Sequence, residues 1–331
     1  MRRVLVTGAS GFIGQRLLKY LYSSGLNIRA TSLSNKPEYL FDSIECLQKD
    51  LMDEDSDLRC LCKDCDAIVH LAGLAHQPGS SWAKYRLTNT KMTQRLAMTA
   101  ATCNVSHFIF MSTAKVFGEG YPPSGKRQYY ADSDVANPEG GYATSKLAAE
   151  EELYAIGLRT GMRCTLLRPP LVYGPGVKGN FAQLLRVVEK GVPLPLASVN
   201  NQRSFIFVDN LCHLIGRLLD SPIKETRMYC VADAAMSTPE MIRAMAKAIS
   251  VSPRLFPFPP SLLRLAGRIT GRHGIIERLT QSFVINDSVI RRDLDWVPPV
   301  SLEEGMKITA EWFLNKAGKN IRDEASVPVV K

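Results

Sequence analysis

The chain has 331 residues, a formal net charge of +9 and a hydrophobic content of 45%. This composition is typical of globular proteins, and the length allows two domains or one large one. No run of about 18 apolar residues occurs, so no transmembrane helix is predicted. The first residues lead straight into a motif rather than a signal peptide, and we expect a cytoplasmic protein.

The basic balance suits acidic ligands such as dinucleotides or sugar nucleotides. The Lys and Arg residues are dispersed rather than clustered with aromatic residues, so nucleic-acid binding is not expected. Cys60, Cys62 and Cys65 are close enough to suggest zinc, but no second cysteine pair or nearby histidine completes a ligand set. Free thiols in a reducing cytosol are the favoured interpretation, and no metal site is predicted.

Short apolar runs alternate with helical patterns through the first half of the chain. Because these runs are continuous, we expect parallel strands covered on both faces. The predicted fold class is therefore α/β, a Rossmann-type doubly wound parallel sheet. Strands are predicted at residues 4–6, 27–31, 67–71, 107–111 and 164–168, and helices at 12–24, 89–102 and 142–157.

After Arg168, proline and glycine become frequent, which indicates a change to less regular structure. We predict a Rossmann domain over residues 1–168 with a return around 203–235, where residues 228–232 would add a strand. Residues 169–315 would form mainly a smaller, mixed substrate domain. The polar residues 316–331 are expected to be a flexible tail.

Three glycines, Gly8, Gly11 and Gly14, lie between the first predicted strand and the first predicted helix. In dinucleotide-binding proteins the first glycine allows a tight turn, the second lets the backbone approach a pyrophosphate, and the third lets the helix pack closely. The helix N-terminus offers free N–H groups and partial positive charge. The loop therefore predicts a dinucleotide site formed by Gly8, Ser10, Gly11, Phe12, Ile13 and Gly14.

The choice of coenzyme stays open between NADP and NAD. NAD sites usually carry a carboxylate after the second strand, where this chain has Ser32 with Arg29 and Lys36 nearby, which leaves room for a 2′-phosphate. Asp50 and Leu51 follow another short segment. Contact with the adenine amino group and a solvated loop acid are both open interpretations of Asp50.

Tyr142 and Lys146 stand four residues apart on one predicted helix face. A nearby ammonium is expected to lower the tyrosine pKa from about 10 toward neutrality. Such a tyrosine can exchange a proton with a sugar hydroxyl or ketone while a nicotinamide exchanges hydride. Ser112 and Thr113 end an upstream strand, where hydroxyls could hold the same substrate oxygen.

In this order the motifs resemble the extended short-chain dehydrogenase/reductase family, in its NAD-dependent epimerase/dehydratase branch, over residues 3–312. The resemblance implies a catalytic set of Thr113, Tyr142 and Lys146 with Ser112 as neighbour. Besides the glycine loop, Tyr142 and Lys146, it implies cofactor contacts at Ser32, Asp50, Leu51, Leu71, Ala72, Gly73, Asn89, Pro169 and Val172. It implies substrate contacts at Thr113, Asn180, Leu196 and Arg203, with His76 as a further candidate.

Structural interpretations stay open for several of these residues. His70 could be a strand-end residue, Asn89 could order a helix start, and Asp209 could cap a helix. His76 could be exposed in its loop without touching substrate.

Family dehydratases usually carry an Asp-Glu pair where Ala114 and Lys115 follow Thr113 here, so dehydration is not expected. We favour 4-keto reduction of a UDP-4-keto-6-deoxy-N-acetylhexosamine in surface-polysaccharide biosynthesis. A UDP-hexose or UDP-N-acetylhexosamine 4-epimerase with retained NAD is the alternative, and a non-catalytic nucleotide-binding regulator is a further one. The family also implies a homodimer through the helices at about 89–102 and 142–158.

Residues 261–272 are both basic and apolar. A helix covering the substrate domain is the favoured interpretation, and attachment to an anionic membrane is the alternative. Membrane association is therefore not expected from the sequence.

Overall fold

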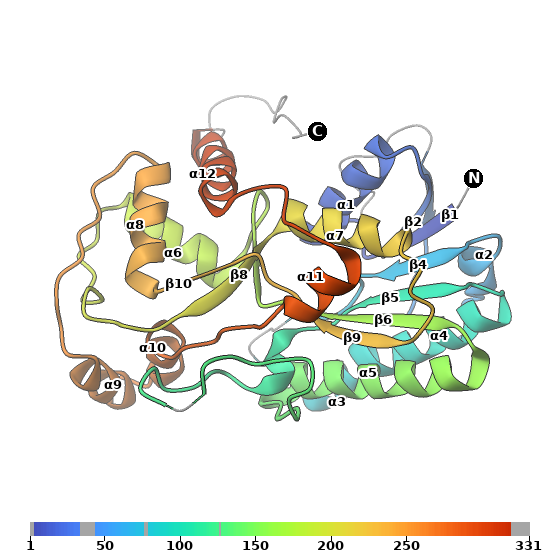
Figure 1. Ribbon diagram of the computed structural model, residues 1–331, viewed down its shortest axis with the longest axis horizontal. Coiled ribbons are helices and arrows are strands. Elements are labelled where there is room, and N and C mark those ends of the chain that lie inside the picture. The colour runs from blue at the N-terminus through green and yellow to red at the C-terminus, as the bar shows by residue number, and fades with distance from the viewer. Residues whose placement is uncertain (1–2, 34–43, 76–78, 126, 319–331) are drawn as a thin grey trace.

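The computed structural model describes residues 3–33, 44–75, 79–125 and 127–318. Its centre is a seven-stranded parallel sheet in the order β3-β2-β1-β4-β5-β6-β9 (Figure 1). The predicted fold class, a doubly wound Rossmann-type sheet, is confirmed. The strands are β1 (Arg3–Thr7), β2 (Asn27–Ser32), β3 (Glu45–Gln48), β4 (Ala67–His70), β5 (His107–Met111), β6 (Arg163–Arg168) and β9 (Arg227–Cys230).

Helices cover both faces of this sheet. Successive strand residues point to opposite faces, so they contribute to two separate cores. Val4 and Val6 of β1 pack in the core with α1 (Phe12–Ser23) and α7 (Val208–Leu219). Leu5, between them, packs in the opposite core with α4 (Met92–Thr102) and α5 (Gly140–Thr160). Burial on both faces explains why the strands are continuous apolar runs.

An ion pair ties α1 to α7 across 193 residues of sequence. Arg16 Nε donates to Asp209 Oδ1 at 2.7 Å. The interpretation of Asp209 as a helix cap is wrong, because Phe207 is the N-cap of α7 and the Asp209 carboxylate binds Arg16 instead.

A second sheet of three strands lies beside the first, in the order β10-β8-β7. Its strands are β7 (Leu171–Tyr173), β8 (Arg203–Phe207) and β10 (Ala234–Met236), with β8 parallel to β7 and antiparallel to β10. The chain leaves the large sheet after β6 and re-enters it as β9. The surrounding helices are α6 (Gly179–Glu189), α8 (Thr238–Ala248), α9 (Pro260–Ile269), α10 (His273–Thr280), α11 (Ser288–Leu294) and α12 (Leu302–Gly318).

The predicted strands and long helices lie within a few residues of those observed, and three differences stand out. The short edge strand β3 was not predicted, because its ends, Glu45 and Gln48, are exposed and polar. The helix predicted at 89–102 begins earlier, as α3 (Trp82–Tyr85) and the π-helix η1 (Arg86–Lys91). Helix α12 includes residues 316–318, which were assigned to the tail. The domain boundaries themselves stay a prediction.

Lys36, His76 and residues 319–331 lie outside the described residues. Within the described ranges, no helix has the length and apolar character needed to cross a membrane.

Candidate functional site

The glycine loop joins β1 to α1 and is closed tightly against β4. Gly8 has φ +66°, and a Cβ there would lie 2.7 Å from the Ala72 nitrogen. Gly11 N donates to Gly8 O at 2.9 Å, and a Cβ on Gly14 would lie 2.9 Å from Ala9 Cα. Side chains at Gly8 and Gly14 would therefore fill or distort the cradle. The N-terminus of α1 faces this cradle. Its first turn has no acidic residue, so no carboxylate there would repel a dinucleotide pyrophosphate.

The loop after β4 forms the next wall of the site. The buried Asn89 side chain accepts from Leu74 N at 2.7 Å and donates to Leu74 O at 3.1 Å. Its amide also donates to Ser145 Oγ of α5 at 3.0 Å. A Cβ on Gly73 would lie 3.3 Å from Lys146 Nζ. The structure thus brings Gly73, Asn89 and Lys146 together, and Asn89 orders the loop rather than a helix start.

The Thr113 and Tyr142 side chains lie near each other, and the Thr113 hydroxyl acts to lower the pKa of the Tyr142 phenol. Thr113 follows β5 as the N-cap of the 3-10 helix η2 (Ala114–Phe117), where its Oγ1 accepts from Lys115 N at 3.2 Å. Tyr142 lies in the first turn of α5, with its ring edge-on to Tyr85. A strand end and a helix start therefore hold the two expected catalytic hydroxyls in contact.

Lys146 lies one turn further along α5 and is buried. Its Nζ donates to the Met111 carbonyl at 2.9 Å and lies 4.6 Å from the centroid of the Phe110 ring. Burial lowers the pKa of Lys146 to about 8, against the opposing effect of the Glu150 carboxylate.

The expected lowering of the tyrosine pKa is wrong for this structure. Burial raises the pKa of Tyr142 to about 12, although the hydrogen bond to Thr113 acts in the opposite direction. The penalty for burying a phenolate therefore exceeds the local stabilisation of that phenolate.

Ser112 does not share the position of Thr113, because consecutive residues of an extended segment point to opposite sides. Its hydroxyl donates to the carboxylate of Glu150, which also pairs with Arg168 at 2.6 Å between Oε2 and Nη2. The side chains of Arg168 and Glu150 are only 3% and 2% exposed. Ser112 thus links β5 to a buried ion pair between α5 and β6, which corrects the expectation that it stands beside the substrate with Thr113.

His70 is fully buried and forms two hydrogen bonds. Its Nδ1 lies 2.7 Å from Thr7 Oγ1, and its Nε2 lies 2.9 Å from Thr93 Oγ1. Thr7 Oγ1 also accepts from Ala72 N at 3.3 Å, and Thr93 Oγ1 donates to Asn89 O at 2.7 Å. Burial lowers the pKa of His70 to about 3, so its ring is neutral. This supports the structural interpretation of His70, as a link between the glycine loop and Asn89.

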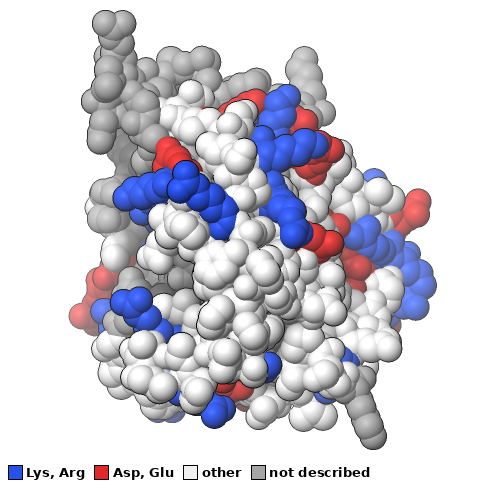
Figure 2. Space-filling model, turned by 90° about the vertical axis from the view of Figure 1, so that its left-hand side faces the viewer, with Lys and Arg blue, Asp and Glu red and all other residues white. Residues whose placement is uncertain are grey.

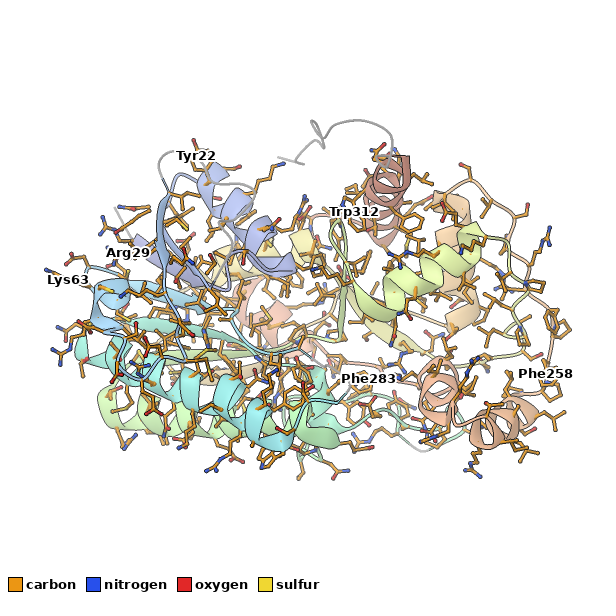
Figure 3. All side chains as sticks on the ribbon, turned by 180° about the vertical axis from the view of Figure 1, so that it is seen from behind. Tyr22, Arg29, Lys63, Phe258, Phe283 and Trp312 are labelled. Atoms are coloured by element: carbon orange, nitrogen blue, oxygen red, sulfur yellow. The ribbon has the colours of Figure 1, made fainter. Side chains whose placement is uncertain are left out.

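The residues expected near the adenosine half have different environments. The Arg29 guanidinium is directed to the sheet edge, where it binds Glu45 at 2.8 Å and Lys63 O at 2.7 Å (Figure 3). Arg29 is therefore not available to a 2′-phosphate, because it is engaged within the protein, and Lys36, the other basic residue considered, lies outside the described residues. Ser32 is buried at the end of β2.

Asp50 and Leu51 lie in the turn that follows β3. Asp50 is exposed, and its Oδ1 accepts from Met52 N at 2.8 Å, while Leu51 packs in the core. Contact of Asp50 with adenine stays a prediction.

Basic groups gather where β8 begins. Arg203 donates to Gln281 O at 3.2 Å, and its guanidinium lies 5.6 Å from the centroid of the Phe283 ring. Burial lowers the pKa of Arg203 to about 10. The Glu119 carboxylate opposes this effect, and the nearby charge of Arg278 adds to it. The sequence analysis missed Arg278, because only the folding of α10 beside β8 reveals the pair. Asn180 is exposed at the second position of α6.

Other residues predicted to bind ligands have roles inside the fold. Leu196 is 3% exposed in the core, and Pro169 is buried with its carbonyl accepting from Ala114 N at 2.8 Å. Val172 is the partly buried middle residue of β7. Their contacts with ligands stay predictions, and His76 lies outside the described residues.

The cysteines first considered for zinc are not arranged as a metal site. Cys62 and Cys65 are buried, and Cys65 Sγ lies near the Arg29 guanidinium at 3.6 Å. No group of three His, Cys, Asp or Glu residues suited to a metal ion occurs among the residues that the structure describes.

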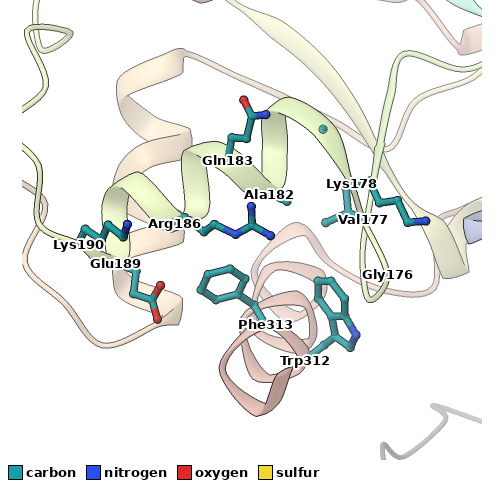
Figure 4. Close-up of a pocket in the computed structure, with 11 residues that line it drawn as sticks. Gly176, Val177, Lys178, Ala182, Gln183, Arg186, Glu189, Lys190, Trp312 and Phe313 are labelled. Carbon is teal, nitrogen blue, oxygen red and sulfur yellow. The ribbon is translucent and has the colours of Figure 1, made fainter. Parts of the chain in front are cut away.

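A pocket of about 590 Å³ lies between α6 and α12 (Figure 4). Its walls include Arg186 and Lys190 of α6 and the aromatic rings of Trp312 and Phe313. None of the residues expected to be catalytic lines this pocket, so it is separate from the site where Thr113 meets Tyr142.

Comparison with known proteins places this geometry in a wider context. A UDP-glucose 4-epimerase of Vibrio cholerae is 35% identical over 329 residues, covering 95% of this chain and 96% of the relative. The solved UDP-glucose 4-epimerase of Thermus thermophilus, a complex with NAD, superposes with a TM-score of 0.75 at 24% identity, covering 94% of this chain and 99% of that one. MoeE5 in complex with UDP-glucuronic acid and NAD gives a TM-score of 0.77 at 23% identity, with 95% and 99% covered.

Residues 4–232 match the model of the NAD dependent epimerase/dehydratase family. This match spans the glycine loop, the Thr113–Tyr142 pair, Lys146 and Arg203, and it confirms the expected nicotinamide-dependent enzyme. The chain therefore belongs to the NAD dependent epimerase/dehydratase family.

Proposed function

We propose that this protein interconverts the C4 epimers of a UDP-hexose or UDP-N-acetylhexosamine with NAD that stays bound. The neighbouring hydroxyls of Thr113 and Tyr142 near the buried Lys146 carry the proposal. The similarity to the Vibrio cholerae UDP-glucose 4-epimerase over nearly the whole chain supports it. Keto reduction was favoured because no carboxylate follows β2, but the engagement of Arg29 within the protein leaves one fewer basic group for a 2′-phosphate.

In the proposed mechanism, Tyr142 Oη accepts the proton of the C4 hydroxyl and later returns it, while Thr113 holds the same oxygen. NAD, when bound, supplies the hydride acceptor and a positively charged ring. Because the pKa of Tyr142 is raised, the phenol needs added positive charge before it can act as a base. Lys146 is already present one turn along the same helix, so the further charge would come from the nicotinamide ring of bound NAD.

Binding residues complete the proposal. The cradle at Gly8, Gly11 and Gly14 would hold the cofactor pyrophosphate at the N-terminus of α1. Arg203 and Arg278 would hold the diphosphate of the sugar nucleotide, since one guanidinium group can donate two parallel hydrogen bonds to phosphate oxygens.

A direct test incubates the purified protein with NAD and UDP-glucose or UDP-N-acetylglucosamine and follows the sugar by NMR. The C4 epimer should accumulate to equilibrium without net NADH, and Tyr142→Phe should abolish this. Tyr129→Phe is the matched control, because Tyr129 is 47% exposed and has no place in the proposed site. Absence of the C4 epimer with both substrates would overturn the proposal.

A 4-keto reductase is the second candidate, favoured by the absence of a carboxylate where β2 ends at Ser32. It would oxidise NADH or NADPH stoichiometrically with a UDP-4-keto-6-deoxy-N-acetylhexosamine. Neither epimerisation nor reduction, with nucleotide binding retained, would favour a non-catalytic regulator.

We also infer a homodimer through α4 and α5. Apolar side chains are exposed on these helices at Met98 (39%), Tyr154 (46%) and Leu158 (71%). Light scattering should give twice the chain mass, and Leu158→Glu should shift the protein toward the monomer. A monomeric wild-type protein at micromolar concentration would contradict this.

A further inference from the structure

Helices α9 and α10 form one tip of the molecule, at the end of the long axis opposite the large sheet (Figure 1). Among the ten residues of α9, Leu263 and Gly267 are the buried ones. Gly267 allows α10 to approach closely, because a Cβ there would lie 2.8 Å from Ile276 Cγ1. Packing within the protein therefore accounts for one face of α9.

The opposite face of α9 is apolar and exposed. Leu262, Leu265, Ala266 and Ile269 follow the i, i+3, i+4, i+7 pattern of a single helix face, which we call the α9 stripe. Leu262 is 48% exposed, Leu265 54% and Ile269 77%. A water-exposed helix would normally turn this pattern toward a core, so the stripe indicates a surface that something else covers.

Nearby side chains extend this exposed apolar surface. Ile275 of α10 is 51% exposed and Phe256, before α9, is 42% exposed. Phe258 lies at the same end of the molecule (Figure 3). The apolar area therefore exceeds one helix face.

Positive charge accompanies the stripe. Residues 251–280 contain five arginines, at 254, 264, 268, 272 and 278, and a single acidic residue, Glu277. Arg264 and Arg268 stand four residues apart on the face adjoining the stripe, and Arg268 and Arg272 are exposed. Figure 2 faces this end of the molecule and shows Lys and Arg side chains bordering areas without charge. Arg278 is half-buried, and its charge acts on Arg203.

We propose that this tip docks the protein on an anionic lipid surface. The α9 stripe would enter the boundary between headgroups and acyl chains, as the apolar face of an interfacial helix does. The arginines would reach the lipid phosphates, since long basic side chains keep their stems in apolar surroundings and their charge at the interface. Ten residues are too few to span a bilayer, so the attachment is peripheral.

This proposal reverses the preference drawn from the sequence. The pattern of residues 261–272 fits both a helix that covers the substrate domain and a helix that attaches to a membrane. The exposure of the α9 stripe distinguishes these two interpretations. A lipid surface also suits the charge better than an apolar partner protein does, because residues 251–280 carry five arginines and a single acidic residue.

The test is sedimentation of the full-length protein with phosphatidylcholine vesicles, with and without about a quarter phosphatidylglycerol, at about 0.15 M salt. The wild type should sediment with the anionic vesicles. The double variant Leu265→Glu/Ile269→Glu should lower the bound fraction at least about tenfold. Arg268→Gln/Arg272→Gln should remove the preference for anionic lipid.

Val297→Glu is the matched control, because Val297 is 73% exposed on another part of the surface and should leave binding unchanged. Equal melting temperatures and equal NAD binding would show that the variants are folded. The proposal is overturned if the wild type does not sediment with anionic vesicles, or if the stripe variant sediments as well as the wild type. It is also overturned if the wild type self-associates without binding vesicles and the stripe variant merely abolishes that self-association.

Discussion

The carboxyl end of the large sheet, where β4, β5 and β6 finish, and the tip formed by α9 and α10 place polar and apolar side chains in opposite ways. At the carboxyl end of the sheet, His70, Lys146 and the Arg168–Glu150 pair are buried, and each has a hydrogen-bond partner. At the tip, Leu265 and Ile269 are apolar and exposed. Buried charge and exposed apolar surface both oppose stability, so each indicates a region retained for another purpose. Substitutions at the carboxyl end of the sheet should therefore damage the fold or the chemistry, whereas substitutions of the exposed residues at the tip should damage neither.

The largest effect is expected at Tyr142, where the comparison predicts a chemical rather than a structural loss. Tyr142→Phe keeps the ring and removes the hydroxyl that contacts Thr113. We expect kcat to fall about 10²–10⁴-fold, the usual contribution of a general acid–base group. Initial-rate measurements test this, and a decrease below about tenfold would contradict the assigned role.

The next effect concerns stability. Glu150→Gln leaves the buried Arg168 guanidinium without its counter-charge and weakens the bond from Ser112. The free energy of unfolding should fall by about 3–5 kcal/mol in urea titrations. Glu303→Gln, which breaks the exposed pair with Lys247, should give no measurable change. Equal effects of the two substitutions would show that burial of the ion pair is unimportant.

A pH-dependent effect is expected at His70. Its pKa is lowered to about 3, so below pH about 6.5 the unfolded state binds a proton that the folded state does not. Relative to His70→Gln, the wild type should therefore lose about 1.4 kcal/mol of unfolding free energy for each pH unit below about 6.5. Denaturation of both proteins at about pH 7, 6 and 5 tests this. If the unfolding free energies of the two proteins changed equally with pH, His70 would be protonated in the folded protein.

The smallest effect is expected at the tip. Leu265→Glu should change the free energy of unfolding by less than about 0.5 kcal/mol, because the side chain is 54% exposed. Leu263→Glu, two residues earlier but only 7% exposed, should cost several kcal/mol by burying a charge. Similar losses for both would show that α9 is covered within the protein.

The same contrast explains what could be predicted from sequence. The strand–loop–helix unit around Gly8 and the pair Tyr142/Lys146 are local patterns, so spacing alone located them. The direction of a side chain depends on long-range packing. Ser112 and Thr113 are adjacent, but only the arrival of α5 and β6 shows that Ser112 binds Glu150.

Packing also determines the contacts of residues whose partners are distant in sequence. Arg29 was noted near the end of the second strand as one of two basic residues that leave room for a 2′-phosphate. Its partners, from Glu45 to Cys65, are visible only in the folded protein. Arg278 was missed because it is 75 residues from Arg203 in sequence and carries no motif. The exposure of the α9 stripe likewise follows from where α10 packs.

The most direct test of the central claim uses UDP-glucose and UDP-N-acetylglucosamine, each labelled with deuterium at C4 and incubated separately with the protein, NAD and ordinary water. If hydride leaves and returns at C4 on a retained cofactor, the product should be the C4 epimer with its deuterium still at C4. Formation of unlabelled epimer would mean that C4 exchanges with water, and absence of any epimer would mean that this site does not carry out the exchange. Either result would contradict the account.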